Sequence, residues 1–173
     1  MAEPVDIHAL VAADLPAYKA LRDAMLAAHP EAFTSDAATE RKRTAQSLLP
    51  RLGLDQPGSG RFVLGAWQAG QLVGTIGCER DMRVKVCHIG HLIGMMVRTE
   101  LQGGGIGRRL LEAGIAAARG VQGIEMLTLT VTTSNTAAVR LYERAGFMRF
   151  GSLPHAIQVD GRYYAKDHMV LTL

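Results

Sequence analysis

The stretch Gln102-Gly103-Gly104-Gly105-Ile106-Gly107 decides the fold predicted for this 173-residue chain. It directly follows the apolar run 92–97 and precedes residues whose apolar positions repeat at helical spacing. This order predicts a strand, a glycine turn and the start of a helix. Glycines let the backbone approach an anion, and the free N–H groups of a first helical turn can hold one. The stretch therefore predicts a turn that binds a phosphate-bearing ligand.

Two common phosphate-binding motifs fit this stretch poorly. A P-loop needs Lys-Ser or Lys-Thr after its last glycine, whereas two arginines follow Gly107. A dinucleotide-binding motif that starts at Gly105 needs a small residue where Leu110 stands. Glu125 begins the next apolar run, whereas the ribose-binding carboxylate belongs at the end of that run.

A second segment narrows the choice. Gln102, Gly105 and Gly107 fit the motif Gln/Arg-x-x-Gly-x-Gly/Ala, and residues 135–147 fit Asn-x-x-Ala-x-x-Leu-Tyr-x-x-x-Gly-Phe. Together the two segments resemble the GNAT superfamily of acyl-CoA-dependent N-acetyltransferases. The resemblance is clear from Arg61 to the C-terminus and thinner before it, although residues 29–33 (HPEAF) look like a segment of some members.

Composition and charge agree with one compact enzyme domain, residues 1–173. The chain is 48% hydrophobic with a net charge of +3, and its basic residues are scattered, which argues against a nucleic-acid partner. No apolar stretch is long enough to span a bilayer, and the acidic residues 1–6 do not resemble a signal peptide. We therefore expect a cytoplasmic protein with no membrane partner, in which Cys78 and Cys87 are buried thiols rather than a disulfide.

Helical and strand periods predict an α/β (α+β) fold. Before Arg61 we expect two helices, one from Asp14 to His29 and one from Ser35 or Asp36 to Leu49. After it, the pattern predicts a mixed, mostly antiparallel central sheet of six or seven strands with helices on both faces. The expected elements are strands at 62–67, 72–78, 86–97, 124–132, 147–150, 157–159 and 163–173, and helices at 106–118 and 135–142. Residues 95–131 should form a right-handed parallel crossover.

The resemblance implies acetyl-CoA as cosubstrate, with no metal. By position, the backbone of Met95, Met96 and Val97 would bind the pantetheine arm and supply N–H groups to the oxyanion. The remaining acetyl-CoA contacts implied by the motifs are Gln102, Gly103, Gly104, Gly105, Ile106, Gly107, Arg108, Asn135, Ala138 and Tyr142. Asn135 also suits a helix N-cap.

Acetyl transfer to an amine needs a base for the ammonium proton and an acid for the departing thiolate. Tyr142 matches the family tyrosine that protonates the thiolate, although its spacing alone also suits a core aromatic residue. For the base we favour His91, whose imidazole titrates near neutrality. Glu79 and then His155 are the alternatives, as is a water relay. His88 has the opposite strand parity, which argues against a His88/His91 metal pair.

The sequence thus predicts an N-acetyltransferase that transfers acetyl directly to a primary amine of a small molecule or peptide. The alternative is a non-catalytic sensor or interaction module that binds acyl-CoA on the same fold. Many acceptors suit this fold, and neither charge nor motifs select one. The resemblance also allows a homodimer.

Overall fold

The computed structural model describes residues 4–173 and shows one seven-stranded mixed sheet. Its strands lie in the order β1-β2-β3-β4-β5-β7-β6, and only the neighbours β4 and β5 run parallel. The strands are β1 (Asp6–Ala9), β2 (Phe62–Gln68), β3 (Gln71–Arg80), β4 (Ile89–Val97), β5 (Met126–Thr132), β6 (Met148–Val159) and β7 (Arg162–Thr172). The fold class predicted from the sequence is confirmed. Residues 1–3 lie outside the described residues, so the structure does not bear on that part of the segment 1–6, which we expect not to be a signal peptide.

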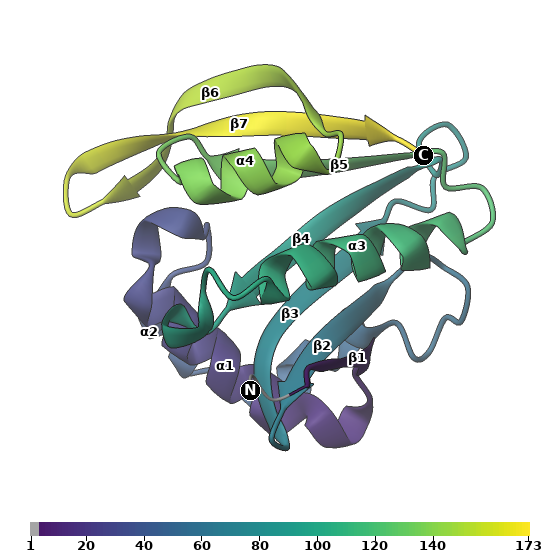
Figure 1. Ribbon diagram of the computed structural model, residues 1–173, viewed down its shortest axis with the longest axis horizontal. Helices are drawn as coiled ribbons and strands as arrows, with labels where there is room; N and C mark the ends of the chain where they lie inside the picture. Colours follow the sequence, from purple (N-terminus) through teal and green to yellow (C-terminus); the bar gives the residue numbers. More distant parts are fainter. Residues whose placement is uncertain (1–3) are drawn as a thin grey trace.

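Helices cover both faces of the sheet (Figure 1). The α-helices are α1 (Leu15–Ala28), α2 (Ala37–Arg41), α3 (Ile106–Arg119) and α4 (Thr136–Arg144), and the 3-10 helices are η1 (Ala12–Asp14), η2 (Pro30–Ala32), η3 (Ala45–Leu52) and η4 (Thr99–Leu101). Helix α3 lies against β2, β3 and β4 on one face, and α1 packs on the other. No helix within residues 4–173 has both the length and the apolar character needed to cross a bilayer.

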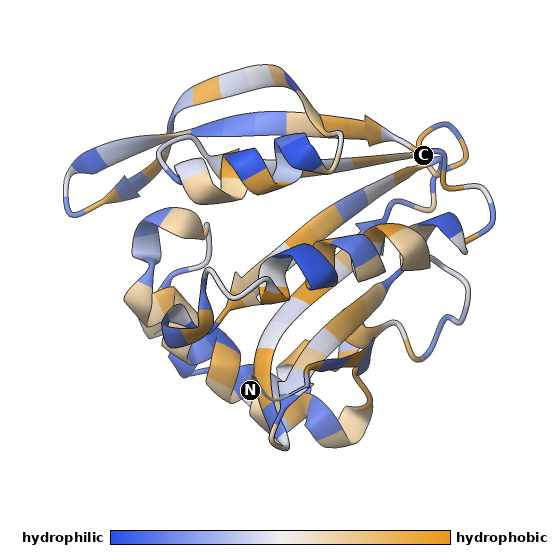
Figure 2. Ribbon diagram, in the orientation of Figure 1, coloured by the Kyte–Doolittle hydropathy of each residue, from blue (hydrophilic) through white to orange (hydrophobic). Residues whose placement is uncertain are grey.

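The strand pattern divides the buried side chains into two cores. Adjacent residues of β3 point to opposite faces, so Leu72 packs under α1 while its neighbour Val73 packs under α3, together with Ile76 and Cys78. Helix α3 buries Leu110, Leu111 and the residues in line with them, and orange and blue segments alternate along it in Figure 2. Its amphipathic pattern therefore holds the glycine turn against the sheet.

The parallel pair β4 and β5 is joined for only a short distance. Residues Ile89 to His91 pair with Met126 to Thr128, and no further pairing between these strands follows. Beyond His91 the two strands separate, so that β5, β7 and β6 form one arm of the fold with α4 (Figure 1). A register shift between β3 and β4 lies at this point, and Gly94 has a φ of 57°. A bulge of this kind bends a strand and increases its twist, which turns β4 away from β5.

Local signals located most elements, with four corrections. The second predicted helix is wrong as one unit: α2 ends at Arg41, residues 42–44 interrupt it, and the chain continues as the 3-10 helix η3, in which Pro50 has no N–H to donate. Strand β4 begins at Ile89 rather than at residue 86, since residues 84–88 form turns. Residues 147–150 and 157–159 belong to one strand, β6, whose register shift accommodates Pro154.

The fourth correction is β1, for which the sequence analysis predicted no element. Its four residues pair antiparallel with β2 and are mostly exposed, so they lack a clear apolar alternation. This segment becomes a strand because it pairs with the free edge of β2, a contact that forms only in the folded chain and that local sequence does not indicate. The strand closes one side of the sheet.

The two cysteines are both free thiols and differ in environment. Cys78 is 1% exposed under α3, and burial raises its pKa to about 12. Cys87 is only partly buried, in the turn before β4. The expectation of free thiols is confirmed, and that of burial holds for Cys78 alone.

We predict that a thiol reagent such as Ellman's reagent labels about one thiol per folded chain at pH 8, because only the Cys87 sulfur is accessible. Labelling should rise to two after unfolding in guanidinium. The variant Cys87→Ser should remove the fast phase and Cys78→Ala should not. Rapid labelling of Cys78 in the folded chain would contradict the packing described for β3.

Candidate functional site

A cavity of about 1360 Å³ opens where β4 and β5 separate. Six consecutive residues of β4, from Leu92 to Val97, line it. A strand that presents one face contributes alternate residues, so this unbroken run shows that an edge of β4 borders the cavity. The lining also includes Leu111 of α3 and Met25 of α1, and these two helices lie on opposite faces of the sheet. The cavity therefore connects the two faces.

The glycine turn forms one end of the cavity. Gly103 and Gly105 have φ values of 83° and 86°, a backbone region that disfavours other residues, and a Cβ on either would meet no neighbour within 4 Å. Gln102 supports the turn, since its Nε2 donates to the Val97 carbonyl at 3.1 Å. Gly105 is the N-cap of α3, with no side chain to cap the first N–H groups. The turn thus presents open space and free donors.

Four exposed arginines line the cavity, and one of them lies at this end. Arg108 is in the first turn of α3, next to the glycine turn, whereas Arg119 ends α3 and Arg140 and Arg144 belong to α4. Arg108 also lies 3.8 Å from Glu112, an exposed pair that leaves its guanidinium mobile. The next residue, Arg109, donates its Nη2 to the Val5 carbonyl at 2.7 Å and is not among the residues that line the cavity.

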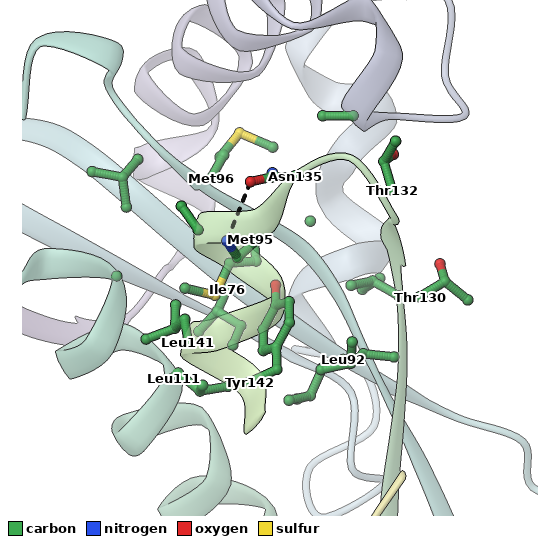
Figure 3. A pocket seen from close by; sticks show the side chains of 18 of the residues that line it. Ile76, Leu92, Met95, Met96, Leu111, Thr130, Thr132, Asn135, Leu141 and Tyr142 are labelled. Carbon is green, nitrogen blue, oxygen red and sulfur yellow. Dashed lines mark hydrogen bonds between the residues drawn. The ribbon is translucent and has the colours of Figure 1, made fainter. Parts of the chain in front are cut away.

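Helix α4 brings Asn135, Ala138 and Tyr142 to the same cavity. The Asn135 Oδ1 accepts from the Ala138 N–H at 3.2 Å, as the dashed line in Figure 3 shows, so Asn135 is the N-cap predicted from the sequence. The start of α4 and residue Met95 of β4 therefore border the same cavity.

Tyr142 is 7% exposed and packs edge-on against Phe147, with ring centroids 6.0 Å apart. Burial raises its pKa to about 12. Figure 3 shows its hydroxyl directed into the open part of the cavity, between Met95 and Thr130. The phenol is therefore held rigidly by apolar neighbours and stays protonated at neutral pH.

The three candidate bases lie in different places. Glu79 lines the cavity at the end of β3. His91 pairs with it across β3 and β4, but its Nδ1 lies 2.5 Å from the Thr128 hydroxyl at the last position where β4 and β5 still pair. It is not among the residues that line the cavity. His155, on β6, is exposed, stacks on Tyr163 and also lies outside the cavity.

The opposite face of the sheet contributes residues that sequence reasoning missed. Arg22 of α1 is buried and bonds Glu40 at 3.2 Å and Ser35 at 2.9 Å. Arg51 of η3 and Lys166 of β7 also line the cavity. The sequence offered one indication of this side of the cavity, which was the similarity of residues 29–33 to a segment of some GNAT members. Within residues 4–173 no three His, Cys, Asp or Glu side chains gather as metal ligands do.

Comparison with known proteins identifies the family of this chain. Residues 18–147 match the Acetyltransferase (GNAT) family. A mycothiol acetyltransferase of Salinispora tropica is 37% identical over 132 residues, which cover 75% of this chain and 42% of that protein. This chain thus spans less than half the length of that relative.

Solved structures share the fold over nearly the whole chain. An acetyltransferase of the GNAT family from Streptococcus pneumoniae superposes with a TM-score of 0.88 at 24% identity, covering 98% of this chain and 99% of that one. The yncA protein of Salmonella typhimurium, solved with its cofactor acetyl-CoA, superposes with a TM-score of 0.84 at 22% identity, covering 98% and 94%. With the family match over most of its length, the chain belongs to the GNAT family of acetyltransferases.

Proposed function

We propose that this protein transfers the acetyl group of acetyl-CoA to a primary amine of a small molecule or peptide. The observation that carries the proposal is the cavity itself, which runs from a glycine turn next to Arg108, past the open edge of β4, to the other face of the sheet. A ligand with phosphates at one end and a thioester at the other suits this cavity, with its phosphates at the glycine turn and its thioester near β4. The mycothiol acetyltransferase relative supports acetyl transfer.

The phosphate end of acetyl-CoA suits the turn formed by residues 103–107. Free N–H groups at the start of α3 bind anions, and the helix dipole favours negative charge there. Arg108, in the first turn of α3, adds positive charge for the remaining phosphate. The pantetheine amides then pair with the edge of β4 at Met95, Met96 and Val97, as an additional strand does.

The chemical step follows from the groups near the bend of β4. Glu79 accepts the ammonium proton, directly or through water, because it alone of the three candidate bases lines the cavity. The amine nitrogen then bonds to the thioester carbon, and a backbone N–H of residues 95–97 stabilises the oxyanion. When the C–S bond breaks, Tyr142 donates its proton to the thiolate, and the second proton lost by the attacking nitrogen returns to the tyrosinate, directly or through water. His91 stays an alternative base that would act through its neighbours.

A substitution in the glycine turn tests acetyl-CoA binding. We predict that Gly105→Ala weakens acetyl-CoA binding by about 10-fold, because the φ of 86° is strained for alanine and the turn relaxes away from the phosphate-binding geometry. The matched control is Gly58→Ala, at a φ of 79° with equally open space in a surface loop. Both variants should lose similar stability. Calorimetric titration with acetyl-CoA separates them, and equal affinities would contradict the assigned phosphate site.

The acid role of Tyr142 generates a second prediction. Tyr142→Phe should lower kcat by about 100-fold and leave the KM for acetyl-CoA nearly unchanged, since only a proton donor is lost. Tyr163→Phe, on the exposed part of β7, is the control and should behave like the unaltered protein. Because the pKa of Tyr142 is about 12, the kcat profile of the unaltered protein should not fall between roughly pH 8 and pH 10 from its ionisation. Full activity of Tyr142→Phe would eliminate this acid.

The second candidate function is an acyl-CoA-binding module without turnover. Such a module would bind acyl-CoA at the phosphate end of the cavity in the same way, but it would need neither the base Glu79 nor the acid Tyr142. Binding of acetyl-CoA with no thiol release across a broad panel of amines would favour it. Homodimer formation stays a prediction.

A further inference from the structure

Two opposite charges border the acceptor side of the cavity without neutralising each other. Arg51 and Glu79 line the main cavity and also a smaller adjoining pocket of about 160 Å³, whose lining includes Ile93 and a second arginine, Arg61. Neither Arg51 nor Glu79 forms an ion pair with any residue in the range 4–173. Opposite charges that lie at one pocket and stay apart can each bind one end of a dipolar ligand.

Arg22, another arginine that lines the cavity, differs from Arg51 because its hydrogen bonds are made within the protein. Arg22 is 4% exposed, and its guanidinium is satisfied by Glu40 and Ser35. Glu40 is further held by Arg43 at 3.1 Å. This network ties α1 to α2 and leaves Arg22 little capacity for a ligand. Arg51 has no such carboxylate partner among the described residues.

Arg51 lies near the bend of β4. Burial raises the pKa of the Tyr18 hydroxyl, and Arg51 opposes that rise through its charge and a side-chain hydrogen bond to this hydroxyl, as does the charge of Arg22. The same hydroxyl lies 3.9 Å from the position that a Cβ on Gly94 would occupy. Arg51 therefore stands near the point where β4 turns away from β5, on the face opposite α3.

Lys166 adds a second unpaired cation to the same cavity. It is 9% exposed on β7, level with Thr132 of β5, and burial lowers its pKa. No carboxylate in residues 4–173 forms an ion pair with it. The cavity wall away from α3 thus has two cations, Arg51 and Lys166, available to an acidic ligand group.

We infer that the acceptor is a zwitterion, an amine that carries a carboxylate as an amino acid does. Arg51 binds the carboxylate, and the amine is presented at Glu79. This inference rests on the proposed function. A planar guanidinium matches a carboxylate in two parallel hydrogen bonds, which fixes the orientation of the acceptor as well as its affinity.

The chemistry of the product agrees with this arrangement. The amine arrives as an ammonium that Glu79 attracts, gives up its proton, forms the N–C bond and leaves as a neutral amide. Its carboxylate is unchanged throughout. The product therefore keeps its contact with Arg51 and loses its contact with Glu79, which favours its release after each turnover. The smaller pocket has the volume of roughly five water molecules, enough for a small side chain.

Matched acceptor pairs test the inference. We would measure kcat/KM for L-leucine against L-leucinamide, L-methionine against L-methioninamide, and L-phenylalanine against its amide. The amides are less basic, so at pH 7 a larger fraction of their amine is free, which offsets the greater nucleophilicity of the more basic amines of the acids. We expect the acids to be at least about 10-fold better, because a site that binds a charged group rejects the analogue that lacks it.

Variants of Arg51 assign the preference to this residue. Arg51→Met should bring the acid-to-amide ratio to about 1 with the KM for acetyl-CoA unchanged, and Arg51→Lys should keep part of the ratio. Arg162→Met, on the exposed β6–β7 turn, is the control and should keep all of it.

Three results would count against the inference, each in a different way. Amides that react as well as acids would overturn it and leave the proposed function intact. A preference that survives in Arg51→Met would overturn the role of Arg51. Binding of acetyl-CoA with no transfer to any acid or amide would contradict the proposed function, and the inference with it.

Discussion

The separation of β4 from β5 is the constraint on which the rest of the site depends. Parallel neighbours in a sheet normally pair along their length, yet these two pair at only three positions. Thr75, fully buried in β3, donates its hydroxyl to the Gly94 carbonyl at 3.0 Å and so holds the bend in place. The result is a strand edge with unpaired peptide groups in the middle of a sheet. Such groups need a partner, and an extended ligand with amides supplies one.

The same separation gives the protein two chemically different surfaces joined by one opening. Arginines of α3 and α4 line one side of the opening, whereas Arg51 of η3 and Glu79 of β3 bring one charge of each sign to the acceptor side. Side-chain bonds fasten η2 across the opening: the Thr132 hydroxyl donates to the Glu31 carbonyl at 2.7 Å, and the His29 Nε2 lies 2.9 Å from the Thr99 hydroxyl. These contacts connect the first helix to both arms of the sheet.

Local chemistry predicted much of the fold and the phosphate end of the site. The glycine turn, the Asn135 cap and the two strands joined by a short turn at residues 157–173 each depend on residues close in sequence, and the structure has all three. Strand β1 and the cationic pair Arg51 and Lys166 depend on partners more than fifty residues away. The environment of His91 is of the same kind, because Thr128 reaches it only through the parallel pairing.

Backbone hydrogen exchange measures the open edge of β4 most directly. Amides of residues 95–97 should exchange more slowly once acetyl-CoA is added, because the pantetheine arm then pairs with the strand. Amides of residues 89–91, where β4 already has neighbours on both sides, should show no change. Saturation with acetyl-CoA that leaves exchange at 95–97 unaltered would contradict the account, because the ligand would then bind elsewhere than along β4.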